Sequence, residues 1–283
     1  MAKAKIEFKD VSYIYQSSTP LATTALNHLN LKIDAGSFTG LVGATGSGKS
    51  TLVNLIDGLI QPTSGQLIIN NHIISNKTSQ KLLDEYRKDV GFVFQFPERQ
   101  LFAQTVREDI SFGPENLGWS VDKVNEAVRQ AAQTMLIEPA LLDKSPFSLS
   151  GGQQRRVAIA GVLAMQPDIL ILDEPTVGLD SASIKQLMEI LKQLNKEGIT
   201  IIMITHYLEL LVPLASQIVA LHDGSLIFQG KAQEFFANEQ LLKGSQLFPP
   251  ESVQVARELR LKETPLSIQG LVNEIADRLR KGG

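Results

Sequence analysis

Gly43-Ala44-Thr45-Gly46-Ser47-Gly48-Lys49-Ser50 is the stretch that decides the fold of this chain. It fits the pattern G-x-x-x-x-G-K-[ST], in which a glycine-rich loop wraps around phosphate groups. The apolar run Phe38 to Val42 precedes it and predicts a strand, and the residues from Lys49 onward have helical periodicity. Because the pattern needs a loop between a strand and a helix, this placement favours a phosphate loop over a flexible turn before an ordinary helix.

The residue types in this loop suit contact with the phosphates of a nucleotide. Glycines let the backbone aim its amide N–H groups at phosphate oxygens, and the helix N-terminus adds the positive end of a dipole. We expect Lys49 to reach the outer phosphates, the Ser50 hydroxyl to bind Mg²⁺ and Thr51 to assist at a phosphate. Kinases, GTPases and ATPases all share such a loop, so other motifs must identify the reaction.

The segments around the loop predict an α/β fold. The apolar runs Ile169 to Leu172 and Ile199 to Thr205 are separated by a helical pattern from Ala182 to Asn195, which is typical of parallel strands with helical crossovers. Near the N-terminus, Ile6 to Tyr15 and Leu29 to Ile33 predict two half-buried strands of an antiparallel flank.

Further segments complete the predicted architecture. Gln66 to Ile74 predicts a hairpin, and Val90 to Gln95 predicts a strand with a polar end. Asp223-Gly224 suits the positive backbone angles of a two-residue hairpin turn. From Glu98 to Met165 the pattern changes to amphipathic helices, which indicates a helical insertion.

Two carboxylates follow the apolar strand Ile169 to Leu172. Asp173 and Glu174 stand at its carboxyl edge, where open α/β sheets place their ligands. Adjacent strand residues face opposite ways, so we expect Asp173 to hold the Mg²⁺ shell and Glu174 to orient or deprotonate an attacking water. An isolated acidic pair would be read as the solvated end of a turn, but a phosphate loop earlier in the chain favours the functional interpretation.

Gln95 and His206 also stand at the ends of apolar strands, so we expect them at the same nucleotide edge. Gln95 suits contact with Mg²⁺ and the attacking water, and His206 suits a hydrogen bond to the γ-phosphate or to Glu174. Taken alone, each would be read as a surface polar residue. Their joint occurrence with the phosphate loop and the acidic pair reverses that interpretation.

Leu149-Ser150-Gly151-Gly152-Gln153, followed by Gln154 to Ala160, matches the signature motif of ATP-binding-cassette (ABC) ATPases. Two glycines and a serine before an apolar-periodic helix make a second phosphate-binding helix N-terminus, although Ser150 can also serve simply as a helix cap. The chain resembles this family over Ile6 to Phe236. The resemblance implies a P-loop NTPase fold of the ABC type, in which the signature of one subunit closes over ATP on the phosphate loop of another.

The resemblance also assigns roles residue by residue. Tyr15 matches the aromatic that stacks on adenine, Gln95 the Q-loop, Gly178-Leu179-Asp180 the D-loop, His206 the switch histidine and Glu174 the catalytic base. The residues expected at ATP are Tyr15, Gly43, Ala44, Thr45, Gly46, Ser47, Gly48, Lys49, Ser50, Thr51, Gln95, Ser150, Gly151, Gly152, Gln153 and Asp180, with Glu174 and His206 catalytic and Ser50, Gln95 and Asp173 around Mg²⁺.

Within this family, Phe94-Gln95-Phe96-Pro97-Glu98 and then Gln100-Leu101-Phe102 resemble the Q-loop region of energy-coupling-factor transporter ATPases, particularly the second of their two ATPase subunits. This resemblance implies an importer ATPase for vitamins or other micronutrients, bound peripherally at the cytoplasmic face of the cell membrane. It implies three partners: a second, related ATPase subunit, an integral membrane coupling subunit and a substrate-binding membrane subunit. The transported solute and the choice between homodimer and heterodimer stay open.

Composition excludes several other classes. The 283 residues include no cysteine, which removes disulfide frameworks, thiolate metal sites and thiol catalysis. With 43% hydrophobic and 20% charged residues, the chain can bury a sizeable core and is expected to be a soluble globular protein. Met1 to Asp10 lacks the apolar core of a signal peptide, so no export is implied.

Two other functions compete with the importer ATPase. The first is a soluble ABC ATPase of DNA repair or translation, but no long coiled coil separates the phosphate loop from the signature, and the chain holds one cassette. With a net charge of −3, the chain has no excess of basic residues to bind nucleic acid, so no nucleic-acid partner is expected. The second is a non-hydrolysing nucleotide-binding subunit, which conflicts with Glu174 and His206.

The chain is longer than one cassette requires. The motifs predict a nucleotide-binding domain over 1–240, with a helical subdomain at about 98–165, and a helical appendage over 241–283. The resemblance suggests that this appendage holds two ATPase subunits together. Its apolar positions can equally fold back on their own cassette; they include Val253, Leu259, Leu271 and Ile275.

Overall fold

Two β-sheets form the centre of the computed structural model, which describes residues 6–245, 247–261 and 264–281. The first sheet has four strands in the order β2-β1-β4-β5, all antiparallel, so the predicted antiparallel flank is confirmed. Its strands are β1 Ile6–Tyr15, β2 Thr23–Ile33, β4 Ser64–Ile69 and β5 His72–Ile74.

The second sheet has six strands in the order β10-β9-β3-β8-β7-β6. All neighbouring pairs are parallel except β9 and β10, which form the predicted hairpin with positive φ at Asp223 and Gly224. The strands are β3 Phe38–Val42, β6 Val90–Val93, β7 Ile169–Asp173, β8 Thr200–Ile204, β9 Gln217–His222 and β10 Ser225–Gly230.

Alternate residues of the central strands enter two separate hydrophobic cores. On β8, Ile201 packs in the core that covers the helical side, whereas Ile202 packs in the core that the two sheets share. The helix α1, Lys49–Ile56, contributes Leu52 and Leu55 to this shared core, so it is fixed between the sheets. Burial on both faces explains why the central strands read as continuous apolar runs.

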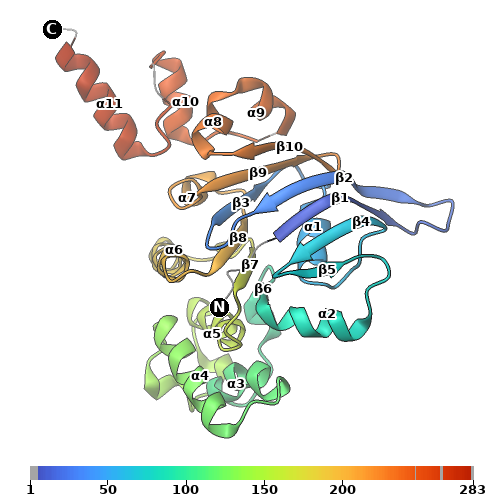
Figure 1. The fold of residues 1–283 in the computed structure, drawn as a ribbon. Coiled ribbons are helices and arrows are strands. Elements are labelled where there is room, and N and C mark those ends of the chain that lie inside the picture. The colour runs from blue at the N-terminus through green and yellow to red at the C-terminus, as the bar shows by residue number, and fades with distance from the viewer. Residues whose placement is uncertain (1–5, 246, 262–263, 282–283) are drawn as a thin grey trace.

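Two groups of helices lie at opposite ends of the molecule, and α2, α6 and α7 lie between them (Figure 1). The helices α3, α4 and α5 form the helical subdomain below β6 and β7, whereas α8 to α11 lie beyond β9 and β10. The bounds are α2 Gln80–Tyr86, α3 Val106–Asn116, α4 Val121–Thr134, α5 Gly151–Leu163, α6 Ser181–Lys196, α7 Leu208–Leu211, α8 Ala232–Ala237, α9 Glu239–Ser245, α10 Glu251–Glu258 and α11 Ile268–Lys281.

Three strand boundaries differ from the sequence prediction. The strand β2 begins at Thr23 rather than Leu29, because its exposed N-terminal half pairs with β1 although it lacks a clear apolar alternation. The strand β6 ends at Val93 and β8 ends at Ile204. Gln95 and His206 therefore lie in the loops after their strands rather than at the last strand positions.

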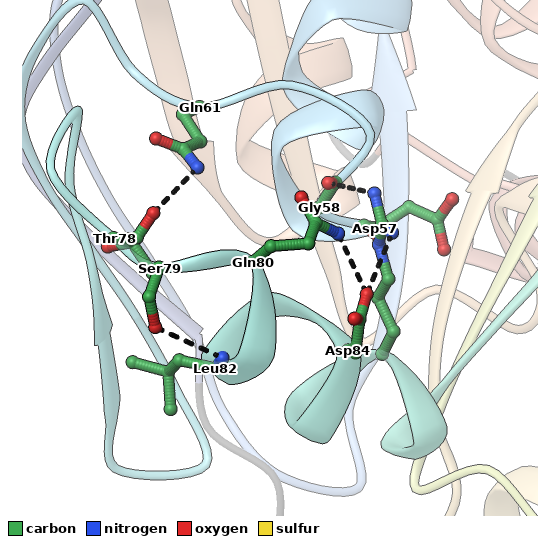
Figure 2. A network of polar contacts seen from close by, with 9 residues as sticks. Asp57, Gly58, Gln61, Thr78, Ser79, Gln80, Leu82 and Asp84 are labelled. Atoms are coloured by element: carbon green, nitrogen blue, oxygen red, sulfur yellow. Dashed lines mark hydrogen bonds and ion pairs between the residues drawn. The ribbon is translucent and has the colours of Figure 1, made fainter.

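The C-terminal end of α1 is anchored by a network of polar contacts to α2 (Figure 2). The Arg87 guanidinium donates to the backbone oxygens of Asp57 and Gly58 and pairs with the Asp84 carboxylate at 3.5 Å. Cations stabilise a helix C-terminus because its last carbonyls carry partial negative charge. Burial raises the pKa of Asp57 to about 7, and Arg87 opposes that shift. The network fixes the far end of the helix that begins in the phosphate loop.

Candidate functional site

The phosphate loop joins β3 to α1 in the predicted way. Gly43 and Gly48 have φ values of 146° and 103°, a region that favours glycine. A side chain at Gly43 would meet the Leu221 carbonyl, and one at Gly48 would lie 2.7 Å from the Ala25 carbonyl. The loop is thus packed against β9 and β2, and Gly48 starts α1 without a side-chain cap. The first amides of α1 remain available for an anion.

Lys49 lies folded over this loop. Its Nζ donates to the carbonyl oxygens of Gly43 and Ala44, each at 2.7 Å, and lies 3.4 Å from the Ser47 hydroxyl. Burial lowers the pKa of Lys49, and the carboxylates of Asp173 and Glu174 oppose this shift. The structure therefore brings the predicted lysine and acidic pair together beside one loop.

Tyr15 lies next to the start of α1. Its hydroxyl is 3.2 Å from the Thr51 hydroxyl, and its ring meets Tyr13 edge to face, with 4.8 Å between the ring centroids. Tyr15 is 41% exposed. The ring therefore adjoins the phosphate loop and keeps a free surface, as stacking on a base requires. The Thr51 side chain is buried, and its hydroxyl lies within hydrogen-bond distance of the Tyr15 hydroxyl.

Glu174 is a buried carboxylate beside His206. Its side chain is 8% exposed, and one oxygen lies 3.4 Å from His206 Nε2. Neither oxygen accepts a hydrogen bond within the described part of the chain. Burial raises the pKa of Glu174, and His206 opposes the shift. A carboxylate with a raised pKa and free acceptor positions suits proton abstraction from a bound water.

The sequence predicts separate roles for Asp173 and Glu174 because adjacent residues of a strand face opposite ways. That reason is wrong. The strand β7 ends at Asp173, and Glu174 has a left-handed backbone with φ of 48°, so strand alternation does not set their directions. Instead, the turn after the strand places Glu174 against His206. Burial also raises the pKa of Asp173, and Lys49 opposes this shift.

The residues predicted around Mg²⁺ fit an ion held mainly by phosphate. No group of three or more metal-binding His, Asp or Glu residues exists within the described residues. Mg²⁺ typically uses one or two carboxylates together with substrate phosphates and water. Ser50 at the exposed start of α1 and the half-buried Asp173 provide such a partial oxygen set. Gln95 is exposed, and its side chain has no hydrogen bond to other described residues.

The signature motif begins α5 as a capped helix. The Ser150 hydroxyl accepts from the Gln153 amide at 3.4 Å, and Gln153 Oε1 accepts from the Ser150 amide at 2.9 Å. The helix-cap role of Ser150 is confirmed, and Gly151 leaves open space at this end. No hydrogen bond or ion pair among the described residues joins this motif to the phosphate loop of the same chain.

Asp180 caps α6 in the same manner. Its carboxylate accepts from the Ser183 amide at 2.9 Å and from the Ser183 hydroxyl at 2.8 Å, and these bonds lower the pKa of Asp180. Gly152 faces Ser183, since a side chain at Gly152 would lie 3.0 Å from that hydroxyl. The D-loop and the signature therefore adjoin each other.

The sequence interpretation missed the partnership of Arg155 and Glu98. Arg155 is 3% exposed and pairs with Glu98 at 2.8 Å. The signal was present in the helical pattern, because positions 155, 159 and 163 share one face of α5 and the other two are buried Ile159 and Leu163. A cation at an apolar position predicts a buried partner.

The chain is similar to ATP-binding subunits of transporters in both sequence and structure. A family model described as ABC transporter matches residues 26–177. The chain is 44% identical to the energy-coupling factor transporter ATP-binding protein EcfA2 of Bacillus cereus, over 99% of this chain and 98% of that relative.

Two solved structures share the fold. The cbiO1 protein from Clostridium perfringens, part of the ABC transporter complex cbiONQ, has a TM-score of 0.76 at 35% identity, covering 92% of this chain and 100% of that one. The ATP-binding cassette MJ0796, a dimer in a post-hydrolysis state bound to ADP and Pi, has a TM-score of 0.70 at 33% identity, covering 80% of this chain and 98% of that one.

Proposed function

This chain belongs to the ABC transporter family, and from that premise we propose that it is the ATP-hydrolysing subunit of an energy-coupling factor importer. The observation that carries the importer assignment is the similarity to an energy-coupling factor ATP-binding protein over nearly the whole chain, the C-terminal helices included. The cargo class that we propose is vitamins or other micronutrients. The buried Glu174 beside His206 supports hydrolysis rather than nucleotide binding alone.

We propose the following division of roles at ATP. Loop amides and Lys49 bind the phosphates, and Tyr15 stacks on the base. Ser50, Asp173 and Gln95 hold Mg²⁺, which supplies charge neutralisation at the phosphates when bound. Glu174 accepts a proton from the attacking water, and His206 holds the Glu174 carboxylate in place.

The site needs a second ATPase subunit. In our proposal Ser150, Gly151, Gly152, Gln153 and Asp180 complete the ATP site of the partner, which explains why the signature has no bond to its own phosphate loop. The partner is a related but different ABC ATPase. The dimeric cassette MJ0796 is a precedent for pairing of two such subunits.

A groove in the helical subdomain is the proposed contact with the integral membrane coupling subunit. It encloses about 370 Å³, and the exposed rings of Phe102 and Phe112 meet edge to face there, with 4.8 Å between the ring centroids. The buried Asp109 carboxylate accepts from the Phe102 amide at 3.1 Å and so fixes the loop that presents this ring. Exposed aromatic pairs beside a groove typically bind an apolar helix face.

The aspartate substitution Phe102→Asp tests this contact. Burying an unpaired carboxylate in an apolar interface is costly, so we expect at least about tenfold less membrane subunit to copurify with the tagged chain. Val121→Asp is the matched control, because Val121 is 75% exposed on α4 of the same subdomain and lies outside the groove. Equal recovery with Phe102→Asp and Val121→Asp would exclude this groove as the contact.

We propose a peripheral position at the cytoplasmic face of the membrane, reached through this partner. Within the described residues, no helix combines the length and apolar character needed to span a bilayer. A soluble role in DNA repair or translation is less well supported, since the segment between phosphate loop and signature folds into short strands and short helices rather than a long coiled coil.

The C-terminal helices divide into a part that packs on the cassette and a part that exposes apolar residues. Val253 of α10 is fully buried, and Arg257 donates to the Phe236 carbonyl at 2.6 Å. On α11, by contrast, Ile268 and Val272 are 66% and 52% exposed. We propose that α11 forms the dimerisation contact of the appendage over 241–283, whereas α10 of the same appendage packs on the cassette domain over 1–240.

Charging the exposed face of α11 tests this proposal. We expect Val272→Asp to weaken ATP-free association with the second ATPase subunit by about tenfold, which corresponds to the loss of one well-packed apolar contact. The neighbouring exposed residue provides the control, Asn273→Asp, with the same added charge. Analytical ultracentrifugation without nucleotide measures the association. If both variants associate like the unmodified chain, α11 does not form the dimerisation contact.

A further inference from the structure

Arg155 is a buried cation that joins three segments of the molecule. From α5, its Nε and Nη2 atoms donate to the two oxygens of Glu98 at 2.9 and 2.8 Å. Its Nη1 atom donates to the backbone oxygens of Pro175 at 3.1 Å and Val177 at 2.5 Å. The planar guanidinium fixes the direction of all four bonds, which a lysine does not do.

Glu98 connects this arginine to the Q-loop. It lies in the 3-10 helix η2, Pro97–Gln100, three positions after Gln95. Phe96, between them, has a left-handed backbone with φ of 56°, so a tight turn joins Gln95 to η2. Although burial opposes it, the hydrogen bonds from Arg155 hold the pKa of Glu98 below its ordinary value, so the pair is ionic.

The two backbone acceptors connect Arg155 to the loop that carries the proposed base. Pro175 directly follows Glu174, and the Val177 amide donates back to the Glu174 carbonyl at 3.3 Å. The carboxylate of Glu174 accepts no hydrogen bond among the described residues and lies 3.4 Å from His206 Nε2. Its position therefore depends on the backbone of this turn as well as on His206, and Arg155 holds that backbone from one side.

Arg155 is buried and Glu98 is partly buried. An ion pair of this kind is an inefficient way to add stability, because the cost of removing its charges from water offsets much of their attraction. Its directional bonds instead fix geometry. We propose that Arg155, oriented by Glu98, is a positioning residue for ATP hydrolysis: it holds the turn that carries Glu174 at a fixed position relative to the Q-loop and the signature helix. This inference rests on the proposed ATPase function and assigns Arg155 no contact with ATP.

The next residue provides a matched control. Arg156 also lies on α5 and makes two hydrogen bonds, to the Leu136 carbonyl and to Gln186 Oε1, both at 3.1 Å. These partners lie towards α4 and α6, away from η2 and the turn after Glu174. Arg156→Lys thus removes a guanidinium group from the same helix without breaking the contacts of Arg155 with η2 and with the turn after Glu174.

The test compares steady-state ATP hydrolysis by assembled complexes that contain the unmodified chain, Arg155→Lys, Glu98→Gln, the double variant or Arg156→Lys. A misplacement of about 1 Å can cost roughly a hundredfold in rate, so we expect Arg155→Lys and Glu98→Gln each to lower kcat at least tenfold. The KM for ATP should change less than about twofold, since the phosphate loop is untouched. The double variant should be no slower than the slower single variant.

A purely structural role would give another pattern. It would lower the thermal unfolding midpoint of the Arg155→Lys and Glu98→Gln complexes and leave kcat per folded complex equal to that of Arg156→Lys, and this result would overturn the inference. Additive losses in the double variant would overturn it too. If the unmodified complex fails to hydrolyse ATP, the proposed function itself is wrong, which is a distinguishable outcome.

Discussion

Glu174→Gln is expected to retain ATP binding while turnover falls by about 10²-fold to 10⁴-fold, the usual contribution of a positioned general base. The amide has the shape of the carboxylate but accepts no proton from water. Because Glu174 lies in the turn after β7 and outside the phosphate loop, nucleotide affinity should change little. Fluorescent nucleotide titration measures binding, and phosphate release from the assembled complex measures turnover.

The control and the pH dependence sharpen this prediction. Glu209→Gln removes an exposed carboxylate just beyond His206 and should leave turnover unchanged. Burial raises the pKa of Glu174, and a base works only when deprotonated, so hydrolysis should decline with falling pH through a midpoint above the ordinary glutamate value. Normal turnover by Glu174→Gln would mean that another group activates the water.

Lys49→Ala is expected to weaken ATP binding by about tenfold to a hundredfold. Hydrogen bonds to a charged group contribute roughly 1.5–3 kcal/mol, and each 1.4 kcal/mol is a factor of ten in affinity. The substitution also removes the two 2.7 Å bonds that tie the loop carbonyls of Gly43 and Ala44 together. Titration of the isolated chain with fluorescent ATP measures the affinity directly.

A lysine on the protein surface provides the comparison for this variant. Lys192 is on α6, where it makes an exposed ion pair with Glu189 at 3.7 Å, and exposed pairs contribute little. Lys192→Ala should bind ATP like the unmodified chain. If Lys49→Ala binds ATP equally well, the charge on Lys49 does not contact the phosphates.

Local patterns predicted most of the fold because its signals are short-range. The phosphate loop needs its glycines in sequence, and buried parallel strands such as β7 and β8 read as apolar runs. The full extent of β2 was not predictable, since its exposed first half is held by pairing with β1 rather than by its own alternation. Propensity alone does not report such tertiary pairing.

The site was predicted as a set of residues but not as a geometry. The motifs gave Glu174 and His206 separately, whereas their 3.4 Å contact depends on a left-handed turn after β7 that no local pattern signals. The helical pattern indicates that Arg155 is buried, but its link to Glu98 joins positions 57 residues apart, so only the folded packing of α5 against η2 identifies this partner.

Identification of the chains that copurify with the tagged protein from its own cell membranes, in mild detergent, tests the central claim most directly. The importer account predicts a second, related ABC ATPase together with integral membrane subunits. Recovery of ribosomes or DNA in their place would contradict it and favour a soluble ABC ATPase.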